Sequence, residues 1–310
     1  MQQQHKGLTM FSNLHIYRLT RPWEMTADRL EGLVEKRPFQ PCGSQDMKSM
    51  GWVSPQDGGP LVHAQGRQWL LSLRIETKAV PGEAIKKTVA EKSKDYEQRN
   101  GYKPARKVLK EMKEEALMEL LPRAFPKQAT IQVWINAEDG WVAMNTSTPS
   151  KADDVVSVLL QTAETAPICL VRTNQSPAQA MSDWLTSCEA PDHFTVDREC
   201  ELKGTEEEKP TVKYSRLSLE RDEIRQHIEE GKRPTKLAMT WEDRVSFILT
   251  DKLQVKKLTF LDAVMEEVNL DAEDADAVFH STFAIMAGEL SKFFPDLVES
   301  LGGEEQYEIA

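Results

Sequence analysis

The chain has 310 residues, of which 40% are apolar, and carries a formal net charge of −11 at pH 7. This length allows one large hydrophobic core or two to three smaller ones. No stretch approaches the roughly 18 to 20 apolar residues that a membrane-spanning helix needs, and the N-terminus lacks an apolar signal core. We therefore expect a cytoplasmic protein with no membrane partner. The 4 cysteines form no CxxC pair, so we expect reduced, mostly buried thiols and neither a zinc site nor a disulfide framework.

Charge is distributed unevenly along the chain. The segment 86–113 contains ten basic residues against four acidic ones, whereas Lys292 is the only Lys or Arg beyond Leu261. A protein that binds nucleic acid needs clustered cations even when its net charge is negative. This pattern fits a basic surface that faces nucleic acid, with the acidic remainder in solvent, and it fits two ordinary solvated surfaces equally well.

The first 80 residues predict a short extension followed by half of a central unit. Residues 1–9 are polar and irregular, and we expect a disordered extension outside the fold. Residues 10–80 predict, in order, a strand at 14–19, a helix at 26–36 capped by Thr26, a long loop at 38–60 and paired strands at 61–64 and 68–76.

Residues 81–128 predict a helical tip. Two charged helices, 83–99 and 105–121, are separated by Gly101 and Pro104. Each helix has at most one modest apolar face, and such a hairpin projects from a body more readily than it fills a core.

The remaining sequence predicts a second half of the central unit at 129–175 and a base domain at 176–310. The first contains a hairpin at 130–136 and 140–145, a helix at 151–165 and a strand at 168–172, and it resembles the unit at 10–80. The base is expected to hold helices at 177–187 and 218–230, a linker or flap at 189–210, strands at 235–240, 244–250 and 255–260, and helices at 272–290 and 292–301. The fold class is therefore α+β, with antiparallel sheet.

Catalytic signatures are almost absent. The chain contains no phosphate-binding glycine loop, no HExxH and no GxSxG. Asp192, Glu201 and Lys203 have the letters of a PD…ExK nuclease, in which carboxylates hold Mg²⁺ and a lysine orients water. They lie in a polar, charge-rich stretch where such strings arise by chance, so we interpret them as solvated surface.

Two groups of basic residues are candidate phosphate contacts. One group lies on the second predicted helix of the tip, and its cations could instead form ion pairs with Glu111, Glu114 and Glu115. The other group lies around the helix predicted at 218–230, and its cations could equally well stabilise the dipole of that helix. Lys256 and Lys257 alternate on a predicted strand, so at most one of them joins the second group. The two groups are Arg106, Lys107, Lys110 and Lys113, and Lys213, Arg216, Lys232, Arg233 and Lys236.

Phe125 lies in a turn between Pro122 and Pro126. On the residues alone we favour a side chain that closes a local core, and the alternative is an exposed interface anchor beside Arg123. The tryptophans lie mostly in apolar runs and are predicted core residues.

Five sequence blocks, taken together, resemble a known family. They are PCGSQDMKSMGW at 41–52, LLPRAF at 120–125, HIEEGK at 227–232, TKLAMTW at 235–241 and MAGEL at 286–290. In this order they resemble the RdgC family of bacterial recombination-associated DNA-binding proteins, from about Phe11 to Gly303.

The resemblance implies a ring-shaped homodimer that encircles double-stranded DNA without sequence preference and restrains the recombinase RecA. It implies a nucleoid-associated binding protein that is not an enzyme and needs no cofactor. Phe125 would contact the second subunit, and the two basic groups, with Lys103 and Arg123, would contact phosphates. Two alternatives stay open, a Mg²⁺-dependent exonuclease and a regulator that binds only protein through Phe125 and the acidic C-terminal helices.

Overall fold

The computed structural model describes residues 10–204, 210–219, 222–267 and 274–305. The extension expected at 1–9 lies outside these residues. The described chain forms one twelve-stranded sheet in which every strand pair is antiparallel. The α+β class with antiparallel sheet is therefore confirmed.

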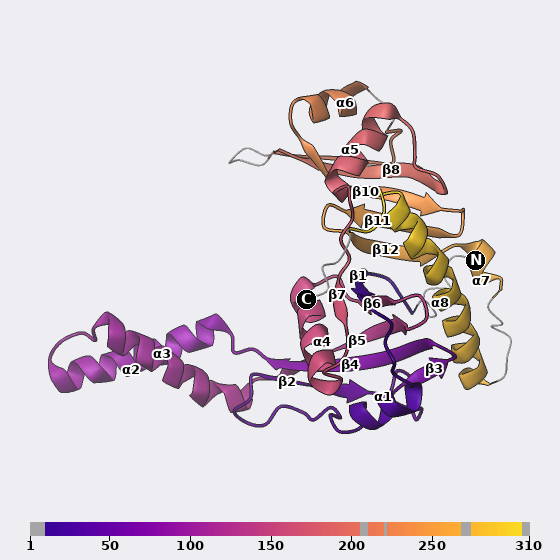
Figure 1. Ribbon diagram of the computed structural model, residues 1–310. Coiled ribbons are helices and arrows are strands. Elements are labelled where there is room, and N and C mark those ends of the chain that lie inside the picture. The colour runs from indigo at the N-terminus through magenta and orange to yellow at the C-terminus, as the bar shows by residue number, and fades with distance from the viewer. Residues whose placement is uncertain (1–9, 205–209, 220–221, 268–273, 306–310) are drawn as a thin grey trace.

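The sheet runs through the whole body of the molecule (Figure 1). Its order is β2-β4-β5-β6-β1-β12-β11-β10-β8-β9, with β3 beside β4 and β7 beside β1. The strands are β1 Leu14–Leu19, β2 Lys48–Val53, β3 His63–Gln65, β4 Gln68–Lys78, β5 Pro126–Asn136, β6 Trp141–Asn145, β7 Ile168–Leu170, β8 Phe194–Lys203, β9 Thr211–Ser215, β10 Arg233–Trp241, β11 Val245–Thr250 and β12 Gln254–Phe260.

Helices cover both faces of the sheet, and one helical hairpin leaves it (Figure 1). The helices are α1 Ala27–Val34, α2 Gly82–Asn100, α3 Arg106–Leu120, the 3₁₀ turn η2 Leu121–Arg123, α4 Pro149–Thr162, α5 Pro177–Ser187, α6 Asp222–Glu229, α7 Asp262–Met265 and α8 Ala275–Glu299. The parts predicted at 10–80 and 129–175 contain the same kinds of element in a different order. In the first part, helix α1 comes before the paired strands β2 and β4, whereas in the second part the β5–β6 hairpin comes before helix α4.

Strand alternation divides the apolar side chains between two cores. Successive side chains of a strand point to opposite faces, so Trp69 packs with α1 and α4 while Leu70 packs under α8. Six of the seven tryptophans are buried, which confirms them as core residues, and Trp184 is partly buried.

The helix α8 joins the two ends of the sheet. Phe294 packs its ring 5.7 Å from Trp134 and 5.6 Å from Trp141, on β5 and β6. The adjacent Phe293 lies 4.9 Å from Phe247 and 5.8 Å from Trp241, on β11 and β10. Between these groups the sheet itself is connected only by the short β1–β12 pairing within the described residues.

The predicted break between two C-terminal helices is wrong, because α8 is continuous from Ala275 to Glu299. The hydroxyl of Ser291, at the predicted break, donates to the carbonyl of Ala287 within the helix. It also accepts hydrogen bonds from the amides of Gln68 and Asn136 on the sheet. Ser291 is therefore a contact between helix and sheet.

The sequence missed three strands. β2 lies inside the expected loop 38–60, and β8 occupies the expected linker or flap, with β9 following it. On β8, Glu199 and Glu201 alternate with the buried Cys200 and Leu202, and its pairing with β10 contains bulges. Charged side chains on one face of β8, together with bulges that interrupt the two-residue alternation, explain why the sequence pattern indicated an irregular polar segment and not a strand.

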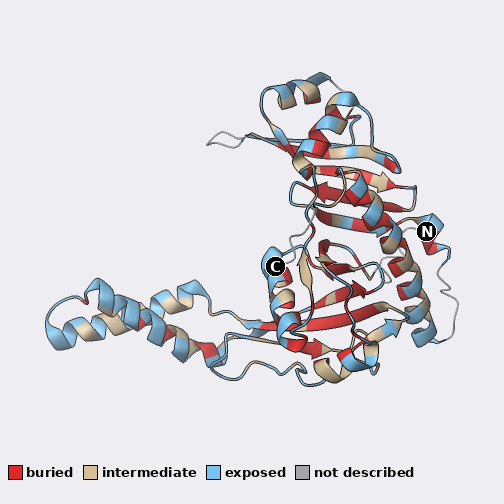
Figure 2. Ribbon diagram, in the orientation of Figure 1, coloured by how far each residue is buried: buried red, intermediate tan, exposed pale blue. Residues whose placement is uncertain are grey.

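The helical hairpin α2–α3 projects from the sheet, as predicted (Figure 1). Most of its residues are exposed, as Figure 2 shows. α2 buries no side chain, and α3 buries only Met112 and Ala116. The small apolar content of the hairpin serves to join the two helices and leaves no core to attach them to the body.

All 4 cysteines are free, as expected. Their predicted burial is wrong for three of them, because Cys188 is exposed and Cys42 and Cys169 are half-buried. Cys200 is buried, and burial raises the pKa of its thiol to about 12.

We expect the Phe293→Ala variant to be less stable by about 3–5 kcal/mol, because it removes a fully buried ring that packs against β10 and β11. Urea unfolding followed by tryptophan fluorescence measures this change. Leu170→Ala is the matched control, since that side chain is 57% exposed and its truncation should change stability by less than about 0.5 kcal/mol. Equal destabilisation of the two variants would show that α8 does not hold the sheet together.

Candidate functional site

The first predicted basic group lies on the projecting hairpin. Arg106, Lys107, Lys110 and Lys113 are exposed on α3, and Lys103 is exposed in the turn before it. Lys110 lies 3.9 Å from Glu114, an exposed pair that contributes little free energy. The hairpin therefore presents several ammonium and guanidinium groups to solvent.

The competing interpretation of this group, neutralisation by neighbouring carboxylates, applies only in part. Glu115 and Glu119 are the partners of Lys92 on α2, at 3.1 and 3.4 Å. Those two acidic residues hold the helices together and leave the α3 cations Lys107 and Lys113 without an ion pair in the described part of the chain. The hairpin therefore combines ion pairs between its two helices with exposed cations on α3.

Phe125 lies at the neck of the hairpin, between η2 and β5, and its side chain is 90% exposed. The expectation that it closes a local core is wrong. β5 begins at Pro126, whose partner across the sheet is Lys78, so the residue before it lies beyond the last strand pair. Met47, half exposed, accepts a backbone hydrogen bond from Lys78 at the same neck. Two exposed apolar side chains therefore lie where the hairpin meets the sheet.

The PCGSQDM block forms the rigid support of this neck. The backbone N–H of Cys42 donates to the Glu76 carboxylate at 2.7 Å, and the amide of Gln128 donates to its other oxygen at 2.6 Å. The hydrogen bonds from Gln128 and Cys42 hold the pKa of Glu76 below its usual value although burial opposes them. The Lys78 ammonium donates to the Gly43 carbonyl. The block thus fixes the loop 41–47 to β4 and β5.

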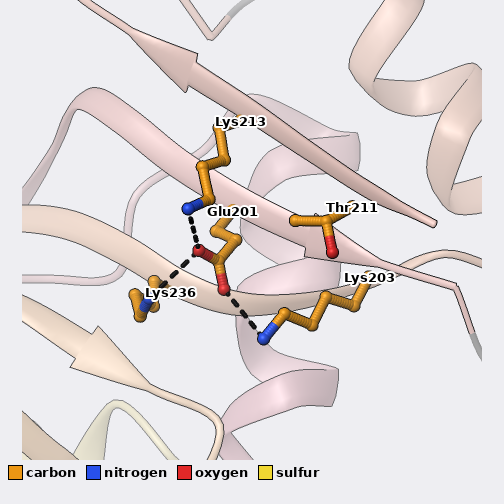
Figure 3. A pocket seen from close by; sticks show the side chains of 5 residues that line it. All are labelled: Glu201, Lys203, Thr211, Lys213 and Lys236. Carbon is orange, nitrogen blue, oxygen red and sulfur yellow. Dashed lines mark hydrogen bonds and ion pairs between the residues drawn. The ribbon is translucent and has the colours of Figure 1, made fainter. Parts of the chain in front are cut away.

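The second basic group centres on Glu201 of β8 (Figure 3). Its carboxylate lies 3.0 Å from the ammonium of Lys236, 3.2 Å from that of Lys203 and 3.3 Å from that of Lys213. We call these four charged residues the base cluster. With Thr211, they line a hollow of about 580 Å³. The strands place them there because Lys213 and Lys236 are the cross-strand partners of Glu201 on β9 and β10.

The base cluster holds Glu201 in its charged form. Burial favours the neutral carboxyl, but hydrogen bonds from Lys236, Thr235, Lys203 and Lys213 outweigh it and lower the pKa to about 2. The side chain of Glu201 is only 7% exposed, whereas those of the lysines are 40 to 69% exposed. In this hollow the ammonium groups are therefore accessible to solvent, whereas the carboxylate is buried.

The other residues of the second predicted group are not brought into this cluster. The Lys232 ammonium pairs with Glu230 at 2.8 Å and approaches His227 at 3.0 Å, beside α6. Arg233 donates to the side-chain oxygen of Gln179. Arg216 is exposed after the end of β9. The single patch expected from the sequence is therefore split, and only Lys213 and Lys236 converge.

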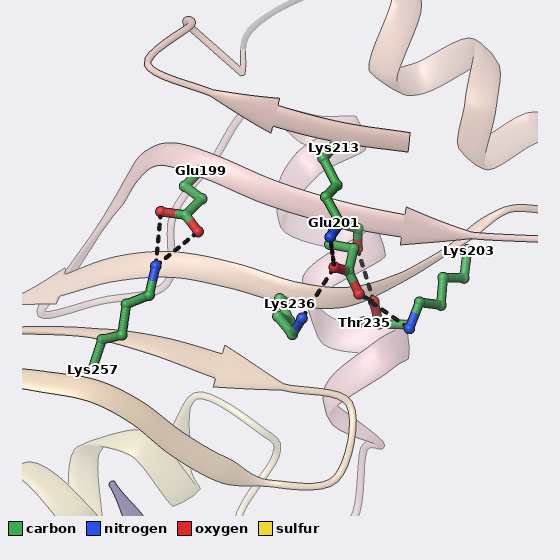
Figure 4. A network of polar contacts seen from close by, with 7 residues as sticks. All are labelled: Glu199, Glu201, Lys203, Lys213, Thr235, Lys236 and Lys257. Carbon is green, nitrogen blue, oxygen red and sulfur yellow. Dashed lines mark hydrogen bonds and ion pairs between the residues drawn. The ribbon is translucent and has the colours of Figure 1, made fainter. Parts of the chain in front are cut away.

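Lys203 is a basic residue that was not predicted in this region, whereas Lys257 was one of two alternatives for it. Lys203 was assigned to the nuclease letters, and a correct β8 would have put it on the face of Glu201, two residues away. Lys257 reaches Glu199 at 3.1 Å, so the network extends along the sheet (Figure 4). A bulge sets two β12 residues against Phe247 of β11, and the alternation assumed for Lys256 and Lys257 fails there.

The nuclease residues do not converge. Asp192 lies in the turn before β8 and Glu201 near its other end, which separates them by more than about 20 Å along an extended strand. Glu201 is saturated by three ammonium groups, and its interpretation as solvated surface is wrong because it is buried. Within the described residues no group of three His, Cys, Asp or Glu side chains is arranged as metal ligands.

The comparison with known proteins decides the family. The family model described as "Putative exonuclease, RdgC" matches residues 9–304. This chain belongs to the RdgC family. The resemblance inferred from the five sequence blocks is thereby confirmed.

Relatives named "Recombination-associated protein RdgC" align over nearly their whole length. The RdgC protein of Cupriavidus pinatubonensis is 44% identical over 296 residues, which are 96% of this chain and 99% of that protein. That of Dechloromonas aromatica is 43% identical over 297 residues, 95% and 98% of the two chains. That of Burkholderia cenocepacia is 41% identical over 296 residues, 96% of each. None of the helices described for this RdgC-family chain is long and apolar enough to cross a bilayer.

We expect the acid sensitivity of this RdgC-family protein to depend on Glu201. A pKa of about 2 in the folded state, below the ordinary 4.5, contributes stability that is present above about pH 4.5 and is lost as pH falls through 2. Between about pH 5 and pH 3 the free energy of unfolding should fall more steeply for the wild type than for Glu201→Gln, as measured by urea unfolding. Glu199→Gln, which alters an exposed pair, should retain the wild-type slope, and equal slopes in all three proteins would contradict the prediction.

Proposed function

We propose that this RdgC-family protein binds double-stranded DNA without sequence preference, as a ring-shaped homodimer with the duplex in its central hole. The observation that carries the proposal is the position of the two basic regions. The α2–α3 hairpin and the C-terminal end of β8 extend toward the same side of the molecule and leave a concave side between them (Figure 1). One region carries Lys107 and Lys113, and the other carries Lys203 and Lys213.

The proposed mechanism consists of phosphate contacts and involves no chemistry on DNA. Lysine and arginine side chains on exposed elements neutralise phosphates and release counterions, which yields affinity without base recognition. The net charge of −11 is compatible with this mechanism, because acidic surfaces elsewhere, as on the chain beyond Leu261, repel DNA from every face except the basic ones.

Two subunits are proposed to close the ring head to head and tail to tail, with the necks of their hairpins forming one of the two contacts. The aromatic side chain of Phe125 is almost fully exposed, and it lies on a neck whose backbone is held in place by the hydrogen bond between Cys42 and Glu76. An exposed ring on a rigid support is the usual form of an interface anchor. Occupation of duplex DNA by such rings would limit access of the recombinase RecA, which agrees with the recombination-associated names of the relatives.

The alternatives are less well supported. For the exonuclease named in the family description, Asp192, Glu201 and Lys203 would have to meet, and β8 holds Asp192 apart from the other two. A protein-only regulator would use Phe125 and the acidic C-terminal helices and would need none of the exposed basic groups. Both alternatives are tested by the same binding experiment.

We expect fluorescence anisotropy of random-sequence duplex DNA in EDTA to show binding whose log K falls linearly with log salt. Replacement of Lys107, Lys110 and Lys113 by Gln should weaken binding and reduce the slope by up to about 0.9 for each phosphate that the variant no longer neutralises. Lys292→Gln is the control, because this exposed lysine lies on α8, away from the hairpin. Absence of wild-type binding at low salt would contradict DNA binding and favour the protein-only regulator. Nucleotide release that appears on addition of Mg²⁺ would favour the exonuclease.

We expect Phe125→Ala to weaken self-association of the protein by about 30-fold or more, since anchor side chains contribute about 2 kcal/mol or more to an interface. Sedimentation equilibrium across a concentration series measures the dimer dissociation constant. Met118→Ala, a half-exposed apolar change on α3, serves as the control for a general reduction of apolar surface. An unchanged dissociation constant for Phe125→Ala would remove this residue from the interface.

A further inference from the structure

Glu201 is an anion placed at the centre of the base cluster. Its two oxygens divide the partners, since Oε1 accepts from Thr235 and pairs with Lys203, while Oε2 pairs with Lys213 and Lys236. Three ammonium groups and one carboxylate leave a local charge of about +2. A cluster that only had to attract phosphates would be stronger without the carboxylate.

The burial of Glu201 makes this neutralisation permanent. An exposed glutamate can rotate away when a phosphate approaches its lysine, but Glu201 is flanked by lysines that are its cross-strand partners on β9 and β10. Figure 4 shows the three ammonium groups turned toward the one carboxylate. A phosphate that contacts any of these lysines must therefore share it with a fixed negative charge.

The neighbouring acidic residues on β8 do not have this property. Glu199 pairs with Lys257 alone, and both side chains are about half exposed or more. Asp197 accepts a hydrogen bond from the Thr240 hydroxyl at 2.9 Å and forms no ion pair in the described part of the chain. Among the carboxylates of this strand, only Glu201 combines burial with three cationic partners.

We propose that Glu201 is a built-in counterion that limits the affinity of the base cluster for the phosphates of DNA. It takes up the equivalent of one lysine charge, so that two of the three ammonium groups are available to phosphates and release from DNA remains fast. This inference rests on the proposed function and identifies an affinity-setting residue within it. Glu201 acts through Lys203, Lys213 and Lys236 and makes no DNA contact of its own.

The decisive experiment measures duplex DNA binding of full-length Glu201→Gln by anisotropy in EDTA over a salt series. Glutamine keeps the shape of the side chain and the hydrogen bond from Thr235. It removes the negative charge, so all three lysine charges become available to phosphates. We expect affinity at low salt to rise about five- to tenfold, the effect of one unit charge a few ångströms from the ligand at the surface. The slope of log K against log salt should steepen by about 0.9, which corresponds to one additional phosphate contact.

Asp197→Asn is the matched control, because it removes the same negative charge from the same strand without freeing a lysine. It should leave the salt slope unchanged. A steeper slope in both variants would assign the effect to net charge and overturn the inference. Weaker binding of Glu201→Gln with a wild-type slope would show that the carboxylate serves to position the lysines, which also overturns it.

A second pair of variants covers the case in which Glu201→Gln unfolds because three lysines repel one another. Lys213→Gln is compared with the double variant Glu201→Gln/Lys213→Gln, which has only two lysines at the cluster. The double variant should bind more tightly, with a salt slope restored to that of the wild type. Equal binding of the two proteins overturns the inference. Absence of binding by the wild type is a different result, because it contradicts the proposed function itself.

Discussion

The packing of α8 across the sheet is the interaction on which the rest of this structure depends. The two parts of the sheet meet through β1 and β12, which share only the register pairs Leu14 with Val255 and His15 with Gln254. Phe293 and Phe294, adjacent on α8, bury their rings against opposite sides of this junction. A continuous helix is stiff over its whole length, so it fixes the position of the base cluster relative to the hairpin.

Several sequence blocks that identify the family serve this framework. In the MAGEL block, the buried carboxylate of Glu289 receives two hydrogen bonds from the guanidinium of Arg244, at 2.6 and 3.0 Å. The pair ties α8 to the start of β11, and bonds to Glu289 and Glu267 raise the pKa of Arg244 further above its usual value. In the PCGSQDM block, Cys42 is tied to Glu76. The blocks are thus supports that hold exposed elements in place, which is why they contain few of the candidate DNA contacts.

The electrostatic design follows from where each charge is fixed. On the hairpin, Lys92 of α2 pairs with Glu115 and Glu119 of α3, which stay largely exposed, and the cations of α3 also face solvent. In the base, the carboxylate of Glu201 is buried and its lysines are exposed. Only the base cluster conceals its anion, but both regions expose cations, so a chain with a charge of −11 can still carry local basic surfaces.

The sequence by itself determined the local elements and the family, because these depend on periodicity, breakers and short ordered blocks. Strand β1, the β5–β6 hairpin and the projecting α2–α3 pair were all predictable from such patterns. Only the tertiary structure decided that β8 is a central strand, that Phe125 is exposed and that Glu201 gathers Lys203, Lys213 and Lys236. The physical reason is that burial and cross-strand register are set by partners distant in the chain, and bulges in β8 and β12 break the alternation from which a sequence would infer them.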